Sequence, residues 1–150
     1  MRLWRLTRAP FVALDGKGAE LFGGRYSPPG VPVVPLASEA GLAVLIALRY
    51  LPRDPNGIAD DHVLGWTEIE DRPERFDEAD EEAVRGFVAK WLGASRSLAL
   101  AIPSRVLPEA DVVLLNPAHP GMAGVAPLTV RPFDFSQCLH VPPMLSRFGE

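Results

Sequence analysis

The stretch Gly23-Gly24-Arg25-Tyr26-Ser27-Pro28-Pro29-Gly30-Val31-Pro32-Val33-Val34 decides how this chain is organised. Its first part, up to Gly30, packs glycines and prolines around one arginine and one aromatic ring, and this composition excludes regular secondary structure. The β-branched residues that follow, over 31–36, favour a short strand. Because proline donates no ladder hydrogen bond, Pro35 either places that strand at a sheet edge or interrupts it there.

A helix is predicted directly after this strand, over residues 40–51. Ser38 suits the N-cap position, Glu39 suits the positive end of the helix dipole, and Pro52 ends the helix. The residues between are almost all apolar, and they include Leu42, Val44, Leu45, Ile46, Leu48 and Tyr50. A helix that is apolar on every side is usually buried, so we expect this helix to lie inside the core.

The sequence outside residues 23–51 predicts short strands and one more helix. The patterns indicate strands over 2–6, 62–69, 97–102, 111–115 and 128–132. Asp15, Gly16 and Gly18 indicate a loop, and a second helix is expected over 77–92 with Gly93 as its stop. Strands mixed with two helices predict an α+β fold, in which flanking helices cover a mixed β-sheet. We expect a single domain over residues 1–150.

Composition narrows the class of protein. The chain has 150 residues, of which 47% are hydrophobic, and this supports a real core. A lone cysteine, Cys138, cannot form an internal disulfide and suits a reducing compartment. The sequence has no apolar run long enough to span a bilayer and no signal-peptide core, so we expect a cytoplasmic protein without a membrane partner. The net charge of −4 argues against nucleic acid as the main partner.

An acidic segment and the histidines each have an ordinary explanation. The segment 68–82 is rich in Asp and Glu, which predicts a solvated loop and helix start, with a partner-binding acidic surface as the alternative. The histidines at 62, 119 and 140 are far apart, and Cys138 with His140 supplies only two possible ligands. Since zinc sites usually need three or four ligands, we expect no metal site.

Five polar residues lie at predicted junctions between loops and strands. They are Arg5, Arg25, Ser104, Asn116 and His119. Taken singly, each has a structural explanation. The arginines suit a solvated surface, Ser104 can cap a turn after Pro103, and Asn116-Pro117 is a common turn dipeptide.

Taken together, the motifs resemble the RES domain. Leu3-Trp4-Arg5, the glycine-rich stretch and the apolar helix are similar to its opening half, where the usual run is Gly-Gly-Arg-(aromatic)-Asn-x-x-Gly-x-x-Val-Val-Tyr-x-Ala before a helix. Ile102-Pro103-Ser104 and Leu114-Leu115-Asn116-Pro117-Ala118-His119-Pro120 resemble its Pro-Ser and Leu-Asn-Pro-x-His-Pro stretches. Arg131-Pro132-Phe133-Asp134-Phe135 looks like its closing segment. The blocks follow the family's order and cover nearly the whole chain.

The resemblance implies a fold, an activity and a partner. RES proteins have a fold similar to ADP-ribosyltransferases and are toxins neutralised by an Xre-like antitoxin, through which any contact with nucleic acid would be indirect. They consume NAD, by hydrolysis or phosphorolysis, or transfer ADP-ribose from NAD to a protein. Matched by position, Arg25 and Ser104 are the expected catalytic residues, and Arg5 and Tyr26 join them in binding NAD. Arginine's planar fork suits the pyrophosphate of NAD.

The chain lacks the glutamate and the tyrosine of the RES pattern. The family's helix glutamate falls at Ile46 and its strand tyrosine falls at Pro35. Isoleucine carries no charge, so the carboxylate that would stabilise a cationic sugar is missing, and nothing in the spacing recommends Glu20 or Glu39 as its replacement. Three interpretations follow. The protein is an active NAD-consuming toxin with a rearranged site, a catalytically impaired RES-fold binding protein, or an unrelated small binding domain.

Overall fold

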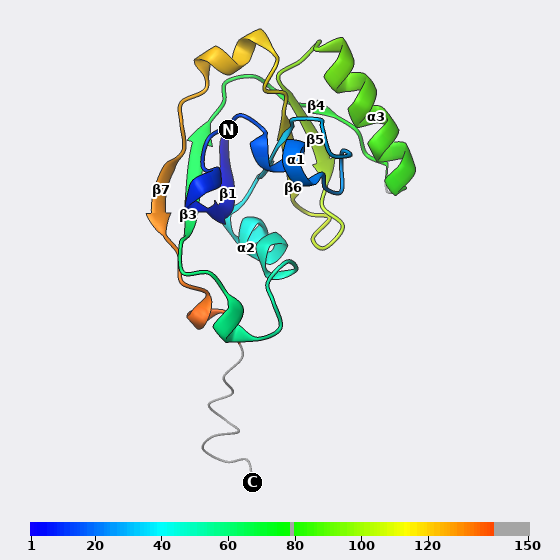
Figure 1. Ribbon diagram of the computed structural model, residues 1–150. Helices are drawn as coiled ribbons and strands as arrows, with labels where there is room; N and C mark the ends of the chain where they lie inside the picture. The colour runs from blue at the N-terminus through cyan, green and yellow to red at the C-terminus, as the bar shows by residue number, and fades with distance from the viewer. Residues whose placement is uncertain (79, 140–150) are drawn as a thin grey trace.

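The structure is a computed structural model that describes residues 1–78 and 80–139, and Figure 1 shows its arrangement. The apolar closing segment, from Val141 to Phe148, is expected from the sequence to pack on the domain, with a partner as the alternative, and it lies outside the described residues. A seven-stranded sheet, in the order β4-β5-β6-β2-β1-β3-β7, forms the centre. Its strands are β1 (Arg2–Arg8), β2 (Val34–Ala37), β3 (His62–Glu68), β4 (Glu74–Arg75), β5 (Ala99–Pro103), β6 (Asp111–Leu115) and β7 (Thr129–Pro132). The helices are α1 (Lys17–Phe22), α2 (Ala40–Leu48) and α3 (Glu81–Ala94).

The sheet is mixed, because β4 and β5 run parallel while all other neighbouring strands are antiparallel. The prediction of an α+β fold with a mixed sheet and flanking helices is therefore confirmed. None of the helices in the described part of the chain is long and apolar enough to cross a membrane.

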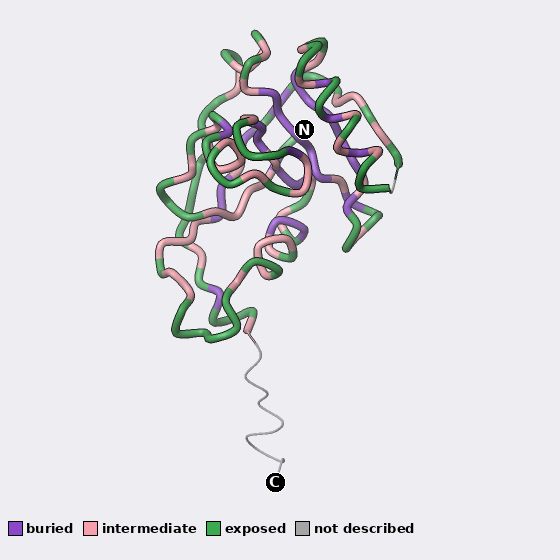
Figure 2. Tube along the Cα trace, turned by 45° about the vertical axis from the view of Figure 1, so that its right-hand side comes forward, coloured by how far each residue is buried: buried purple, intermediate pink, exposed green. Residues whose placement is uncertain are grey.

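The three helices pack on one face of the sheet. In α3, Val84, Val88 and Trp91 form a buried cluster with residues of β5 and β6, and Ala19 of α1 packs against it. Leu42 and Ala43 of α2 form a second cluster with Ala37 and Leu64. The opposite face is covered by loop residues, including Met122, Val125 and Leu128. Figure 2 shows that the buried residues follow the central strands and the inner side of α3.

The prediction of a wholly buried helix over 40–51 is wrong. The helix α2 ends at Leu48, and only Leu42 and Ala43 in it are buried, while Leu45 is 38% exposed. One side of α2 packs on β1 and β2, and the rest lies open. Ser38 is not its N-cap either: the cap residue is Glu39, and the Ser38 hydroxyl instead accepts a hydrogen bond from the amide of Asp111.

Two helix boundaries also differ from the prediction. The second predicted helix, α3, begins at Glu81 rather than near Asp77, because the carboxylate of Asp80 accepts a hydrogen bond from the amide of Ala83 and caps it. It continues through Gly93 and ends at Ala94, and its C-cap residue Ser95 has a left-handed backbone with φ of 51°. The helix α1 lies where a loop was expected, since six residues with a glycine among them carry little periodic signal.

Pro35 lies in an internal strand, so the prediction of an edge position is wrong, but an interruption does occur there. The strand β2 pairs with β6 along its whole length, and with β1 only through Ala37 opposite Trp4. Since Pro35 has no N–H to donate, β1 and β2 diverge on this side. The sheet therefore opens between two central strands.

Three acidic residues of 68–82 form ion pairs with arginines. Glu68 pairs with Arg2, Glu74 pairs with Arg96, and Asp77 pairs with Arg75. This is the solvated arrangement that the sequence analysis expected of this segment.

Candidate NAD-binding site

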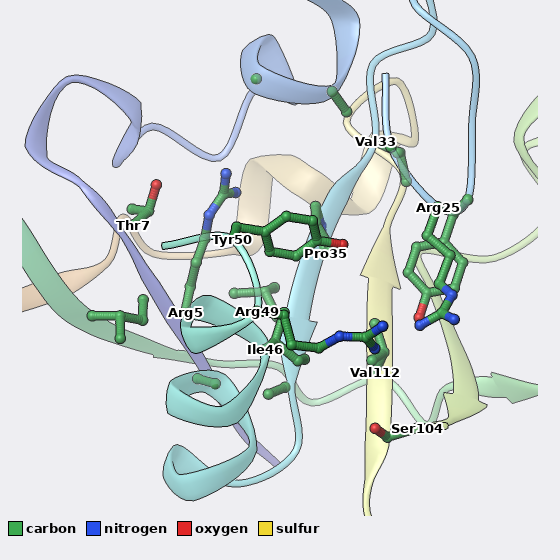
Figure 3. Close-up of a pocket in the computed structure, with 18 of the residues that line it drawn as sticks. Arg5, Thr7, Arg25, Val33, Pro35, Ile46, Arg49, Tyr50, Ser104 and Val112 are labelled. Carbon is green, nitrogen blue, oxygen red and sulfur yellow. The ribbon is translucent and has the colours of Figure 1, made fainter. Parts of the chain in front are cut away.

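A cavity of about 320 Å³ lies where β1 and β2 diverge. Its wall includes Arg5 from β1, Pro35 from β2, the end of α2, the glycine-rich loop and the segment after β5 (Figure 3). Arg5, Arg25, Tyr26 and Ser104, the residues singled out from the sequence, all line this one cavity. They come from four separate segments, and the opening in the sheet brings them together.

Backbone geometry shapes the glycine-rich loop. Gly23 has φ of +67°, and a Cβ atom there would lie 2.8 Å from Cδ of Pro29 and 2.9 Å from its nitrogen, so only glycine fits. The amide of Gly24 donates to the carbonyl of Ser27 at 2.9 Å and closes a tight turn around Arg25. Arg85 of α3 then donates to the carbonyls of Gly24 and Arg25, both at 2.8 Å. A helix thus holds the loop that presents Arg25.

Arg5 is a buried cation. Burial lowers the pKa of its guanidinium from the ordinary value, and the charge of Asp15 partly offsets this effect. The group remains charged at neutral pH, because arginine starts so far above it. Its Nη1 atom is buried and has no hydrogen-bond partner among the described residues. A buried donor without an acceptor is costly, and an anionic ligand would satisfy it.

Two hydroxyl groups face the same cavity. Ser104 is 4% exposed, and its oxygen accepts one long hydrogen bond, of 3.4 Å, from the amide of Leu107. Ser27 stands where the RES pattern has asparagine; it is 3% exposed, and its oxygen has no partner within the part of the chain that the structure describes. Both hydroxyls can therefore donate hydrogen bonds to a ligand.

Three further residues of the cavity were not predicted: Arg49, Tyr50 and Arg105. Arg49 and Tyr50 follow the last residue of α2, and their signal in the sequence is a cation and an aromatic ring at the end of an apolar run. Arg105 follows Ser104 and lies 3.5 Å from the carboxylate of Glu81. Burial raises the pKa of the Tyr26 hydroxyl, while Arg25, Arg105 and Arg49 lower it, so these cations lie around Tyr26.

No aspartate or glutamate lines this cavity within the described residues. Ile46 and Pro35, which stand in place of the family's glutamate and tyrosine, both contribute apolar surface to its wall. Glu20 and Glu39, considered as replacement carboxylates, are not part of the wall. A smaller hollow of about 270 Å³ shares Arg25, Tyr26, Ser104 and Arg105 with the cavity, and its other lining residues include Asp77, Glu78 and Glu81. Carboxylates therefore lie near the cavity but outside it.

Asn116 and His119 have structural tasks away from this cavity. The Asn116 amide donates to the carbonyl of Leu92 and its oxygen accepts from the amide of Ala118. Nδ1 of His119 accepts a hydrogen bond from the amide of Gly121 and caps the short turn of helix at Pro120–Gly124. Across residues 1–78 and 80–139, no three potential metal ligands lie together.

Comparison with known proteins agrees with this architecture. The RES domain matches residues 2–136. A Prs ADP-ribosylating toxin from Sphingobium sp. is 30% identical over 79% of this chain and 81% of that protein. A protein named Toxin Res from Yersinia enterocolitica is 32% identical, over 79% of this chain and 86% of its own.

A solved structure shares the fold at lower sequence identity. The crystal structure of the M. tuberculosis MbcT–MbcA toxin–antitoxin complex contains a chain that superposes with a TM-score of 0.62 at 18% identity. The match covers 87% of this chain and 80% of that one. On the extent of the domain match and these relatives, the chain belongs to the RES family.

Proposed function

We propose that this protein is the toxin of a toxin–antitoxin pair, and that it acts on NAD in the cytoplasm through one RES domain over residues 1–150. The observation that carries the proposal is that Arg5, Arg25 and Ser104, far apart in the sequence, line one cavity. RES-family membership and the relatives named as toxins support the same assignment.

The cavity suits a dinucleotide. Its pyrophosphate would lie between Arg5 on β1 and Arg25 on the glycine-rich loop, where two guanidinium groups without a hydrogen-bond partner among the described residues can form charge-assisted hydrogen bonds. Ser104 would donate to a ribose hydroxyl or to the nicotinamide amide. The rings of Tyr26 and Tyr50 offer apolar faces on which a base or the nicotinamide can stack.

The reaction is the cleavage of the bond between nicotinamide and ribose. The bonding pair leaves with nicotinamide, which becomes neutral, and positive charge develops on the sugar. Water, phosphate or a protein side chain then forms the new bond to the ribose and releases a proton. Arg25 and Ser104 would hold the reacting ribose in place, which is a substantial part of the catalysis.

A purified-protein assay tests this proposal. Loss of NAD is followed by chromatography with and without phosphate, and transfer is followed with labelled NAD and bacterial lysate. We expect NAD loss or labelling with the native chain, and at least a tenfold reduction in the Arg25→Ala variant. The matched control is Arg53→Ala, because Arg53 is exposed and lies outside the cavity. Intact NAD and no labelled protein under all conditions would refute the enzymatic proposal.

A second candidate function is binding of NAD without cleavage. The specific observation in its favour is the absence of a carboxylate from the wall of the cavity, as described above, where Ile46 replaces the glutamate of the family pattern. Removing an electrostatic contribution of this kind costs about 10²–10³ in rate. Calorimetric binding of NAD, with the dinucleotide recovered intact, would select this candidate over the first.

The partner we propose is a cognate Xre-like antitoxin that covers the cavity. The support is the structural likeness to the toxin chain of a toxin–antitoxin complex, together with the family resemblance. A small helix-turn-helix protein encoded beside this gene would support the pairing. A structure of the complex in which the cavity stays open would contradict the proposed mode of inhibition.

A further inference from the structure

The positive charge of the cavity exceeds what the pyrophosphate of NAD requires. Four arginines line it, at positions 5, 25, 49 and 105, and its described wall contains no acidic side chain. NAD carries two negative charges on its pyrophosphate and one positive charge on its nicotinamide ring. Arg5 and Arg25 are enough to bind that pyrophosphate, so Arg49 is left without a ligand group, and Arg105 has only an exposed ion pair with Glu81 at 3.5 Å.

The arginines of the cavity differ in their partners. Half of the described arginines of this protein donate a hydrogen bond to a carboxylate or a carbonyl, namely Arg2, Arg8, Arg75, Arg85, Arg96 and Arg131, and Arg105 forms an ion pair with Glu81. The guanidinium groups of Arg5, Arg25 and Arg49 have no such partner within residues 1–78 and 80–139. Arg53 and Arg72 share this property, but both are exposed and lie outside the cavity. Gathering like charges in one cavity is unfavourable unless an anion binds there.

Arg49 is directed into the cavity by the end of α2. It is the C-cap residue of that helix, and its backbone amide donates to the carbonyl of Ile46 at 3.2 Å. In Figure 3 its side chain extends away from α2, past Val112, in the direction of Arg25. The effect of Arg25, Arg105 and Arg49 on the pKa of Tyr26 is a separate indication that these three cations are close neighbours.

Arg5 lies at a different part of the wall. Its side chain comes from β1, on the α1 side of the cavity, where a Cβ on Gly18 would be 4.0 Å from its Nη2 atom. Figure 3 shows the Tyr50 ring between Arg5 and the group formed by Arg25 and Arg49. The cavity therefore has one cation at one end and three cations at the other.

We infer that Arg49 and Arg105, beside Arg25, form a subsite for an additional phosphate, and that the preferred dinucleotide is NADP, which carries a 2′-phosphate that NAD lacks. This inference rests on the proposed function, because it takes the same cavity as the dinucleotide site. A phosphate held by one or two guanidinium groups should improve binding at least tenfold.

Calorimetry on the full chain tests the subsite with NAD, NADP and two fragments, adenosine 2′,5′-bisphosphate and AMP. We expect NADP to bind at least tenfold more tightly than NAD, and the bisphosphate to bind more tightly than AMP. Arg49→Gln should remove most of both preferences, so that NADP then binds about as tightly as NAD. Arg49→Lys should keep part of them, and Arg53→Gln, the matched control, should change neither. Thermal unfolding of each variant verifies that it is folded.

The outcomes separate this inference from the function on which it rests. Equal binding of NAD and NADP by the native chain would overturn the subsite and leave the proposed function standing. Binding of neither dinucleotide would overturn both. A preference for NADP that survives Arg49→Gln would remove Arg49 from the subsite.

Discussion

At the scale of single residues, the cavity combines an excess of guanidinium groups with an apolar side chain at the position of the family's glutamate. Ile46 lies on the inner side of α2, half-buried, and packs against both clusters on the helix-covered face of the sheet. Because it also lines the cavity, its side chain points toward the space a substrate would occupy. A carboxylate introduced at this position would face the reacting sugar directly.

The Ile46→Glu variant should consume NAD about 10²–10³ times faster than the native chain. The new carboxylate would stabilise positive charge on the ribose, and Arg25 and Arg49 in the same cavity would favour its ionised form. Replacing a half-buried isoleucine should also lower the free energy of unfolding by about 1–3 kcal/mol. Initial rates of NAD loss and urea unfolding curves measure the two effects. The Ile46→Gln variant has a similar shape without the charge, and an equal gain in that variant would exclude the electrostatic explanation.

At the scale of elements, α3 positions the glycine-rich loop from outside the cavity. Arg85 donates to two consecutive carbonyls of that loop and is not part of the cavity wall. The Arg85→Ala variant should weaken NAD binding about tenfold, because the loop loses two charge-assisted hydrogen bonds and Arg25 is no longer held in place. Calorimetry measures the change. Lys90→Ala, on the exposed side of the same helix, is the control. If the Arg85→Ala variant bound NAD as tightly as the Lys90→Ala variant, this positioning role would be contradicted.

The short strand β4 is held by a network that depends on pH. Glu74 accepts hydrogen bonds from Arg96 at 2.9 Å and from Ser97 at 3.0 Å, and the buried Trp91 donates its indole N–H to Ser97. Arg96, followed by Ser97, lowers the pKa of Glu74 below its ordinary value of 4.5. A lowered folded-state pKa stabilises the fold above the ordinary value, and this stability is lost as the pH falls through the folded-state pKa.

The native chain should therefore lose stability below about pH 4.5 more steeply than the Glu74→Gln variant. At neutral pH the variant should be less stable, because it keeps the shape of Glu74 without the charge that Arg96 binds. Urea unfolding between pH 3 and pH 7, as a series on both proteins, measures the difference. Parallel stability curves over this range would show that the pairing contributes nothing. Glu109→Gln, at an exposed residue, is the control.

Strongly patterned elements were predictable from the sequence, and those set by tertiary contacts were not. The strand 111–115 has the predicted bounds because four of its five residues, Val112 to Leu115, are buried between neighbouring strands and the core. The burial of α2 was overestimated, because an apolar sequence does not tell how much of a helix its neighbours cover. The strand β4 is two residues long and exists only through pairing with β5. No local pattern marks such a strand.

For the candidate site, sequence motifs singled out Arg5, Arg25, Tyr26 and Ser104, which line one cavity in the structure. Three further lining residues were found only from the structure: Arg49, Tyr50 and Arg105. The first group lies in blocks with a recognisable order. The second group lies on segments whose direction depends on where α2 ends and how the chain turns after β5. The sequence also could not show that the sheet opens between β1 and β2, since that opening results from the register of three strands around Pro35.

At the scale of the whole molecule, charge is separated. The net charge is −4, yet four arginines gather in the cavity, whereas Glu68 and Glu74 pair with arginines outside it and Glu81 pairs with Arg105 of its wall. An antitoxin that covers the cavity would face a positive opening within a negative protein. It is therefore expected to place Asp or Glu side chains, or a terminal carboxylate, against Arg25 and Arg49.

Expression of the native chain in bacteria should arrest growth, and co-expression of the cognate antitoxin should restore it. The physical reason is that the antitoxin competes with NAD for the same guanidinium groups, so NAD levels fall only while the cavity is free. Arg25→Ala should abolish the arrest, because it removes a cation that NAD needs, whereas Arg53→Ala, at an exposed residue outside the cavity, should still arrest growth. Viable counts and cellular NAD, measured over the hours after induction, report both effects.

Since the antitoxin is proposed to bind these same cations, Arg25→Ala should also weaken the toxin–antitoxin complex at low salt more than at high salt. Arrest with unchanged NAD would point to a protein target instead of NAD depletion. Arrest by Arg25→Ala as strong as that by the native chain would remove Arg25 from the mechanism altogether.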